Sequence, residues 1–130
     1  MATTRTPRRT RSKNGPRLVV RPIRVEDLDA IQALHERAFK GDFAPWSRAN
    51  LENHISLFPE GQLCVELDGE VVATSSSLIV DIEALGWEHT YEDVCQGGFL
   101  RRHDPHGDYL YGIDIAVDPR HRGMKLSRRL

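Results

Sequence analysis

The sequence predicts an α+β domain, and three observations support this. Between residues 18 and 117, helical and strand patterns follow in the order strand, helix, helix, strand, strand, irregular segment, strand. Asp68-Gly69 separates two of the strand-like runs, and a turn this short requires antiparallel strands. The apolar run YLYGIDIAV at 109–117 predicts a well-buried strand. A chain of 130 residues has room for one such domain.

The first half of the domain has clear local signals. Residues 18–23 (LVVRPI) are rich in β-branched side chains and predict a strand with which order begins. Residues 25–39 repeat apolar side chains at helical spacing behind an acidic first turn, which predicts a helix. Ser47 is a suitable N-cap for a second helix, and the sequence Pro-Glu-Gly at 59–61 ends it.

The second half alternates strands with a less regular segment. Residues 62–67 and 71–82 predict the antiparallel pair on either side of the tight turn. Thr90 can cap a single helical turn that ends before two consecutive glycines, and residues 104–108 (DPHGD) form a loop. The strand at 109–117 follows that loop. Strict alternation along it places Ile113 on the face opposite to Asp114.

Charge is distributed unevenly along the chain. Residues 1–17 carry six basic side chains and residues 120–130 carry five, with no acidic residue in either segment. All 19 acidic residues lie between them, with the remaining seven basic ones. The first segment has almost nothing to bury, so we expect a disordered basic arm over 1–17. Nucleic-acid binding is the alternative for this arm, but it has no aromatic residue to stack on bases.

Several classes of protein are disfavoured by the composition. No apolar run approaches the roughly 20 residues of a membrane-spanning helix, and the N-terminus lacks the apolar core of a secretory signal. Cys64 and Cys95 have no metal-ligand spacing, and His103 and His106 flank a turn without a third ligand nearby. We therefore expect a cytoplasmic, reduced protein with no membrane partner and no metal.

The informative segment is IDIAVDPRHRGMKLSRRL at 113–130. A strand ends at Val117, a short cationic loop follows, and helical spacing begins near Leu126. The first N–H groups of a helix lack internal partners and favour negative charge, and Arg122 and Lys125 add charge-assisted hydrogen bonds. This arrangement predicts a site for a diphosphate.

These residues resemble the acetyl-CoA signature of the GNAT superfamily of N-acetyltransferases, Gln/Arg-x-x-Gly-x-Gly/Ala after a strand that ends in Val-x-Pro. Arg122, Gly123 and the lead-in Val117-Asp118-Pro119 match, whereas Lys125 and Ser127 stand at the two signature glycine positions. The resemblance implies a fold of α/β/α layers with a mixed, mostly antiparallel sheet. Residues 18–130 would be the N-terminal part of that domain, incomplete at the C-terminus, and we expect 1–130 alone to be inactive.

Four further segments resemble a narrower group, in which a GNAT domain precedes a carbon–nitrogen hydrolase (nitrilase-like) domain. They are LFPEGQ (57–62), ATSSSLIVD (73–81), HDPHGD (103–108) and YGIDI (111–115). The resemblance implies a covalently attached hydrolase domain as a partner, whose catalytic Glu, Lys and Cys would lie beyond Leu130.

The resemblance also implies the ligands and the site. Acetyl-CoA would be the co-substrate and a small-molecule or peptide amine the acceptor. The residues implied in cofactor binding are Ile115, Ala116, Val117, Arg122, Gly123, Met124, Lys125, Leu126 and Ser127. Amine attack on a thioester needs a base, for which Asp114 and Glu66 are the candidates.

Each of these side chains also has a structural interpretation. Asp114 can be a hydrogen-bond partner within the fold, and Glu66 an exposed strand residue. Trp46 and Trp87 can line the acceptor pocket or pack in the core. A non-catalytic acyl-CoA-binding or scaffolding module remains the alternative function, because Lys125 and Ser127 depart from the signature.

Overall fold

The computed structural model describes residues 17–40 and 46–130, so the predicted basic arm lies almost wholly outside the described residues. Four strands form one sheet in the order β1-β2-β3-β4, and every pairing is antiparallel. The strands are β1 (Leu18–Pro22), β2 (Gln62–Leu67), β3 (Glu70–Val80) and β4 (Tyr109–Val117). The four predicted strands are thus confirmed, and the turn at Asp68-Gly69 joins β2 to β3.

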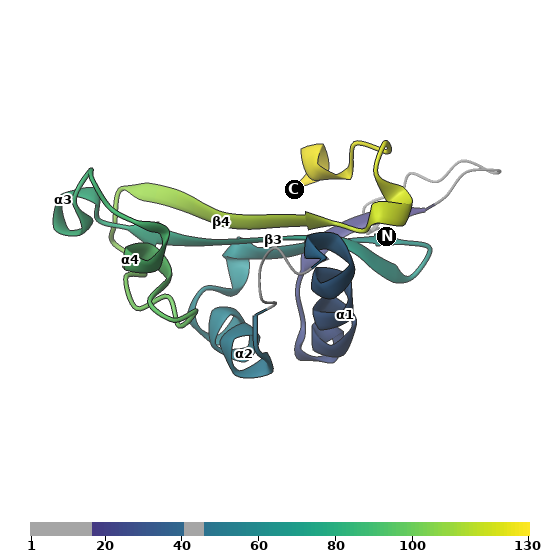
Figure 1. The fold of residues 1–130 in the computed structure, drawn as a ribbon, viewed down its shortest axis with the longest axis horizontal. Coiled ribbons are helices and arrows are strands. Elements are labelled where there is room, and N and C mark those ends of the chain that lie inside the picture. The colour runs from purple at the N-terminus through teal and green to yellow at the C-terminus, as the bar shows by residue number, and fades with distance from the viewer. Residues whose placement is uncertain (1–16, 41–45) are drawn as a thin grey trace, which may run out of the picture.

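Helices α1 (Leu28–Phe39) and α2 (Arg48–Leu57) follow β1. The predicted cap is confirmed, since the Ser47 side chain accepts a hydrogen bond from Asn50 N at 3.0 Å. Single 3-10 turns lie before α1, at Val25–Asp27, and after α2, at Pro59–Gly61. Both helices lie on the same side of the sheet (Figure 1).

The long connection between β3 and β4 contains two short helices, α3 (Ile82–Leu85) and α4 (Tyr91–Cys95). Thr90 caps α4 as predicted. Side chains of α2 fasten this connection by donating to three consecutive backbone carbonyls. These bonds are Asn50 Nδ2 to Gly97 O (3.1 Å), His54 Nε2 to Gly98 O (2.7 Å) and Asn53 Nδ2 to Phe99 O (2.7 Å).

Gly98 permits this close approach. A Cβ atom at that position would lie 2.7 Å from the Asn50 side chain, and its φ of +85° is one that other residues rarely adopt. The connection is therefore held against α2 and beneath β4.

The core has two sides. Beneath the sheet, α1, α2 and α4 cover apolar residues of the strands (Figure 1). The C-terminal segment lies above the sheet (Figure 1), and its Leu126 packs against Val65, Val72 and Ala73. The predicted layering on both faces is present, although the upper layer is thin.

Two expectations about β4 were wrong. It is not well buried, because Leu110 is 69% and Ile115 56% exposed on the face that the C-terminal segment leaves open. Nor does it alternate strictly: Ser76 pairs with Asp114 and Ser77 with Gly112, so Ile113 forms a bulge without a partner on β3.

The C-terminal segment also differs from the prediction of a helix. Leu126–Arg129 forms a 3-10 turn, closed by bonds from Arg128 N to Lys125 O and from Leu130 N to Ser127 O. A further 3-10 turn, Pro119–His121, lies between it and β4.

Buried histidines make this fold sensitive to acid. Burial lowers the pKa of His35 to about 4, and its Nε2 lies 3.0 Å from Thr74 Oγ1. An unfolded chain binds the proton near pH 6.5, so stability is complete above that pH and is lost as the pH falls towards 4. The loss from this residue is about 3 kcal/mol over that window.

We therefore predict that His35→Gln, in the natural full-length protein, reduces the loss of unfolding free energy between pH 6.5 and 4. Urea denaturation across that range measures it, with His106→Gln in the exposed 104–108 loop as the control. Equal acid sensitivity in both variants and the wild type would show that His35 is not responsible.

Candidate functional site

The bulge in β4 determines where Asp114 points. Because Ile113 is an extra residue, Ile113 and Asp114 both face the helices. Ile113 packs with Leu78 and Val94 beneath the sheet. Asp114 Oδ2 accepts a hydrogen bond of 2.6 Å from Trp46 Nε1, at the start of α2. The bulge thus places a carboxylate among apolar and aromatic side chains.

The other carboxylate oxygen of Asp114 has no partner among the described residues. Oδ1 is buried and forms no hydrogen bond with any described residue. Burial raises the pKa of Asp114 to about 6, and the bond from Trp46 opposes that rise. Asp114 is thus ionised at neutral pH, has a free acceptor oxygen and titrates close to neutrality. These are the properties of a general base.

Among the described residues, four titratable side chains beneath the sheet are neutral at neutral pH. Burial raises the pKa values of Tyr91 and Cys95 on α4, which keeps both protonated. Burial lowers the pKa values of His54, on α2, and His35, on α1, which keeps both neutral. The shift of Asp114 is in the opposite direction to that of the histidines, because burial raises its pKa to about 6.

The loop after β4 is fixed to α1 by an ion pair whose carboxylate is buried. Asp118 is fully buried and accepts hydrogen bonds from Arg37 Nη2 at 2.9 Å and Arg120 Nη2 at 2.6 Å. These arginines hold the pKa of Asp118 well below its usual range. Arg120 also pairs with Glu70 at 3.0 Å. The start of the loop is thus fixed relative to both α1 and β3.

Two of the next residues have positive φ angles. Gly123 has a φ of +100°, and Lys125 has a φ of +58° in the left-handed region. Lys125 stands at a signature glycine position and adopts a conformation that glycine enters without cost. Arg122 donates to Ala38 O at 3.1 Å and is otherwise exposed. The loop backbone therefore faces solvent.

Unpaired cations surround a hollow next to this loop. Its volume is about 540 Å³, and it is lined by Val20, Met124, Lys125, Arg128 and Arg129. None of these three cations forms an ion pair with a described residue. The arrangement attracts an anion with several charges, such as a diphosphate.

Two of the predicted cofactor-binding residues have buried side chains that a cofactor could not contact. Leu126 is buried against the sheet, and the side chain of Ala116 is buried beneath it, so both could contribute only backbone groups. Along β4, Ile115, Ala116 and Val117 pair with β3 on one side, and no described strand pairs with the other.

Glu66, the second predicted base, lies elsewhere. Its Oε2 accepts a hydrogen bond of 2.6 Å from Arg21 Nε, and it belongs to β2, two strands away from β4. The structure therefore does not bring Glu66 and Asp114 together.

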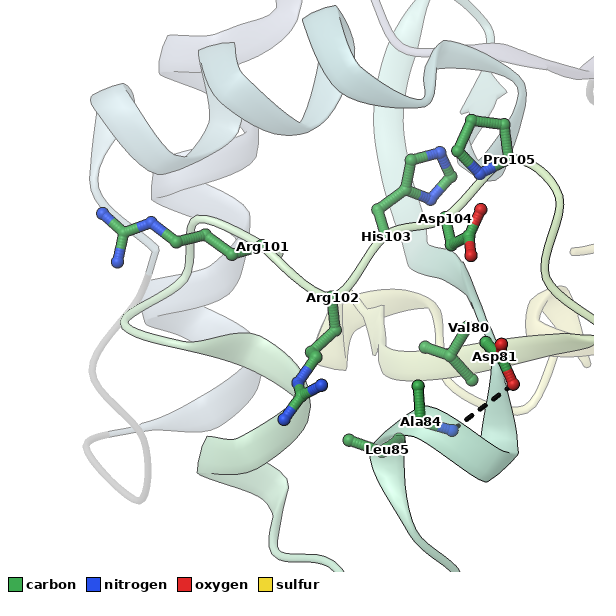
Figure 2. A pocket seen from close by; sticks show the side chains of 9 residues that line it. All are labelled: Val80, Asp81, Ala84, Leu85, Arg101, Arg102, His103, Asp104 and Pro105. Carbon is green, nitrogen blue, oxygen red and sulfur yellow. Dashed lines mark hydrogen bonds between the residues drawn. The ribbon is translucent and has the colours of Figure 1, made fainter.

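A second hollow, of about 320 Å³, lies at the far end of the sheet from the cationic loop. Figure 2 shows Asp81 and Asp104 at one side of it and Arg102 beside Leu85 at the other. His103 accepts a hydrogen bond from Ile79 N through Nδ1, and its ring stacks on Phe58. These contacts give His103 a structural role in holding the loop against β3. Within residues 17–40 and 46–130, no three His, Cys, Asp or Glu side chains gather as metal ligands would.

Comparisons with known proteins identify the family of the chain. Residues 28–130 match the acetyltransferase (GNAT) family. The chain belongs to the GNAT family. Its fold is the GNAT fold, and the family's chemistry is acyl transfer from acyl-CoA.

Two curated relatives come from Bacillus subtilis. The probable hydrolase YhcX is 38% identical over 114 residues, and the uncharacterized N-acetyltransferase YkwB is 33% identical over 116 residues. The match covers 88% and 87% of this chain but only 22% and 51% of the two relatives. The chain thus spans at most about half the length of these curated relatives.

Two solved structures share the fold. The loading GNATL domain of CurA from Lyngbya majuscula superimposes with a TM-score of 0.70 at 20% identity, covering 86% of this chain and 53% of that one. The GNAT-like decarboxylase GphF, in complex with isobutyryl-CoA, has a TM-score of 0.67 at 26% identity, with 81% and 51% covered.

Sequence reasoning missed two contacts of Asp114's surroundings. Trp46 was expected to pack in the core or line a pocket, and its hydrogen bond to Asp114 was not predicted. Tyr91 donates through its hydroxyl to Ile113 O at 3.1 Å. No local pattern signals either contact, because the partners lie 68 and 22 residues apart.

No helix among the described residues is long and apolar enough to cross a membrane.

Proposed function

We propose that this chain is the N-terminal part of an N-acetyltransferase domain that transfers the acetyl group of acetyl-CoA to an amine by direct attack, with Asp114 as the base. The observation that carries the proposal is the buried carboxylate with a free oxygen, on the strand that leads into the cationic loop. In the reaction the amine nitrogen forms a bond to the acyl carbon and the carbon–sulfur bond breaks. Asp114 takes the proton from nitrogen and later releases it to solvent, and the leaving thiolate of CoA takes up one proton from solvent.

Acetyl-CoA would lie along the unpaired edge of β4. The backbone of Ile115, Ala116 and Val117 would hold the thioester arm, and the 122–127 loop would hold the pyrophosphate. The positive φ values of Gly123 and Lys125 and the unpaired cations nearby support this assignment. Acetyl rather than a larger acyl group is supported by the similarity to YkwB.

We also propose that the domain precedes a carbon–nitrogen hydrolase in a longer, cytoplasmic protein. The 38% identity to the probable hydrolase YhcX, of which this chain spans 22%, supports the fusion. The acceptor would be a small-molecule or peptide amine.

A non-catalytic acyl-CoA-binding module is the second candidate. It is favoured by Lys125 and Ser127 at the signature glycine positions, where a side chain limits the approach of a phosphate to the backbone. Such a module would bind acetyl-CoA but would not need Asp114.

Arg122 provides a test of the proposed cofactor site. In the natural full-length protein, Arg122→Asp should weaken acetyl-CoA binding about 10- to 100-fold, because it removes a charge-assisted hydrogen bond and adds a repulsive charge. Arg101→Asp makes the same charge change at the far end of the sheet and should leave the Kd within about twofold. Isothermal titration calorimetry measures both, and equal affinities would rule out the proposed pyrophosphate site.

Asp114→Asn tests the proposed base. Asp114→Asn should lower kcat for acetylation of a reactive amine about 10²- to 10⁴-fold. It should also abolish the rise in kcat/KM with pH near 6, since Asp114 acts only when deprotonated. Acetyl-CoA affinity should not change. Glu66→Gln should keep the pH-dependent rise, and loss of that rise in Glu66→Gln alone would identify Glu66 as the base instead.

A further inference from the structure

A base on a bulged strand needs its side chain fixed, because Asp114 can rotate about two bonds and the strand is irregular beside it. We propose that Trp46 is the positioning residue for Asp114: its indole N–H holds Oδ2 and leaves Oδ1 to receive the proton of the acceptor amine. The proposal rests on the role of Asp114 given above. It assigns to Trp46 a function other than core packing.

The Trp46 side chain is itself held in place. Its ring meets the ring of His54 edge-on, with 5.5 Å between centroids, and it packs against apolar residues beneath the sheet. Its backbone carbonyl accepts a hydrogen bond of 3.3 Å from Gln32 Nε2 on α1. Contacts with α1 and α2 therefore fix both ends of the residue. The N–H group has little freedom to follow Asp114 if the carboxylate turns.

The backbone beneath Asp114 is fixed from another element. Ile113 has no partner on β3, and its carbonyl oxygen accepts the hydrogen bond from Tyr91 on α4. Thr90 caps that helix, and the carbonyls of residues 97–99 tie the same connection to α2. The indole of Trp46 thus contacts α2 directly, through His54. The bulge is linked to α2 indirectly, through Tyr91 and the connection between β3 and β4.

The two oxygens of Asp114 consequently have different roles. Oδ2 takes a short bond from a donor that cannot lose its proton at ordinary pH. Oδ1 is buried and has no described partner, and an unpaired buried carboxylate oxygen is unfavourable unless a donor reaches it. The ammonium or amine group of the acceptor is such a donor. Tyr91 and Cys95, which interact with Asp114, and His54, which contacts Trp46, are neutral at neutral pH and do not compete for this donor.

Trp46→Phe tests the proposal, because phenylalanine keeps an aromatic ring in the core but removes the N–H donor. The matched control is Trp87→Phe, since Trp87 is 68% exposed and contacts Tyr109 rather than Asp114. The natural full-length protein would be labelled with ¹³C-carboxyl aspartate and titrated by NMR, with Asp114→Asn assigning the signal. The pH dependence of kcat/KM would be measured in parallel.

We expect Trp46→Phe to raise the pKa of Asp114 by about one to two pH units, because a hydrogen bond to the charged form is lost. The acidic limb of kcat/KM should move upward by the same amount, and neither should move in Trp87→Phe. An unchanged Asp114 titration in a folded Trp46→Phe protein would overturn the proposal. A raised pKa with an unmoved acidic limb would keep the Trp46–Asp114 interaction and reject Asp114 as the base.

A second readout needs no change to the tryptophan. In the unaltered protein, the indole N–H proton of Trp46 should shift with the pKa of Asp114, near 6, and this titration should vanish in Asp114→Asn. The Trp87→Phe spectrum excludes Trp87 as its source, and the loss of the titration in Asp114→Asn distinguishes this indole from any other. An indole N–H signal of Trp46 that does not titrate would overturn the proposal even if Trp46→Phe fails to fold.

Discussion

The pairing of β4 with β3 is the interaction on which the candidate site depends. Eight residue pairs join the two strands, and the pairing skips Ile113. That single unpaired residue turns Asp114 towards the helices, where it meets Trp46. Without the bulge, residues 113 and 114 would face opposite sides of the sheet, and the carboxylate and Ile113 could not both be buried beneath it. Strand β4 thus provides both the proposed base, the side chain of Asp114, and the proposed backbone contacts to the thioester arm along its unpaired edge.

The cationic loop depends on β4 in turn, through Asp118. A buried carboxylate is costly unless it is paired, and Arg37 and Arg120 both pair with it. Arg37 belongs to α1, so the loop that leaves the sheet is fixed to the helix that covers the opposite face. The arginines of this loop therefore differ in role: Arg120 is occupied by Asp118 and Glu70, whereas Arg128 and Arg129 line the hollow beside the loop. Lys125, Arg128 and Arg129 form no ion pair with a described residue, so their charge remains available to an anion near the 122–127 loop.

Much of the fold was predictable because its signals are local. The caps at Ser47 and Thr90 and the turn at Asp68-Gly69 involve neighbouring residues and were found from the sequence. The exposure of Ile115 and the bulge at Ile113 were not, since both depend on which residues of β3 and of the C-terminal segment meet the strand. For the site, Asp114 was among the candidates because an acid in an apolar strand is conspicuous. Its bond to Trp46 joins residues 68 positions apart, and no periodicity reveals such a contact. The cofactor contacts remain predictions.

A crystal structure of the natural full-length protein with a non-hydrolysable acetyl-CoA analogue tests the account most directly. The account predicts the pyrophosphate against the backbone of residues 122–127 and the acyl carbonyl at the free edge of β4. It also places Asp114 Oδ1 facing the acyl carbon across the space where the amine enters. A cofactor bound elsewhere on the domain would contradict the account, as would an Asp114 carboxylate turned away from the acyl group and paired with another side chain.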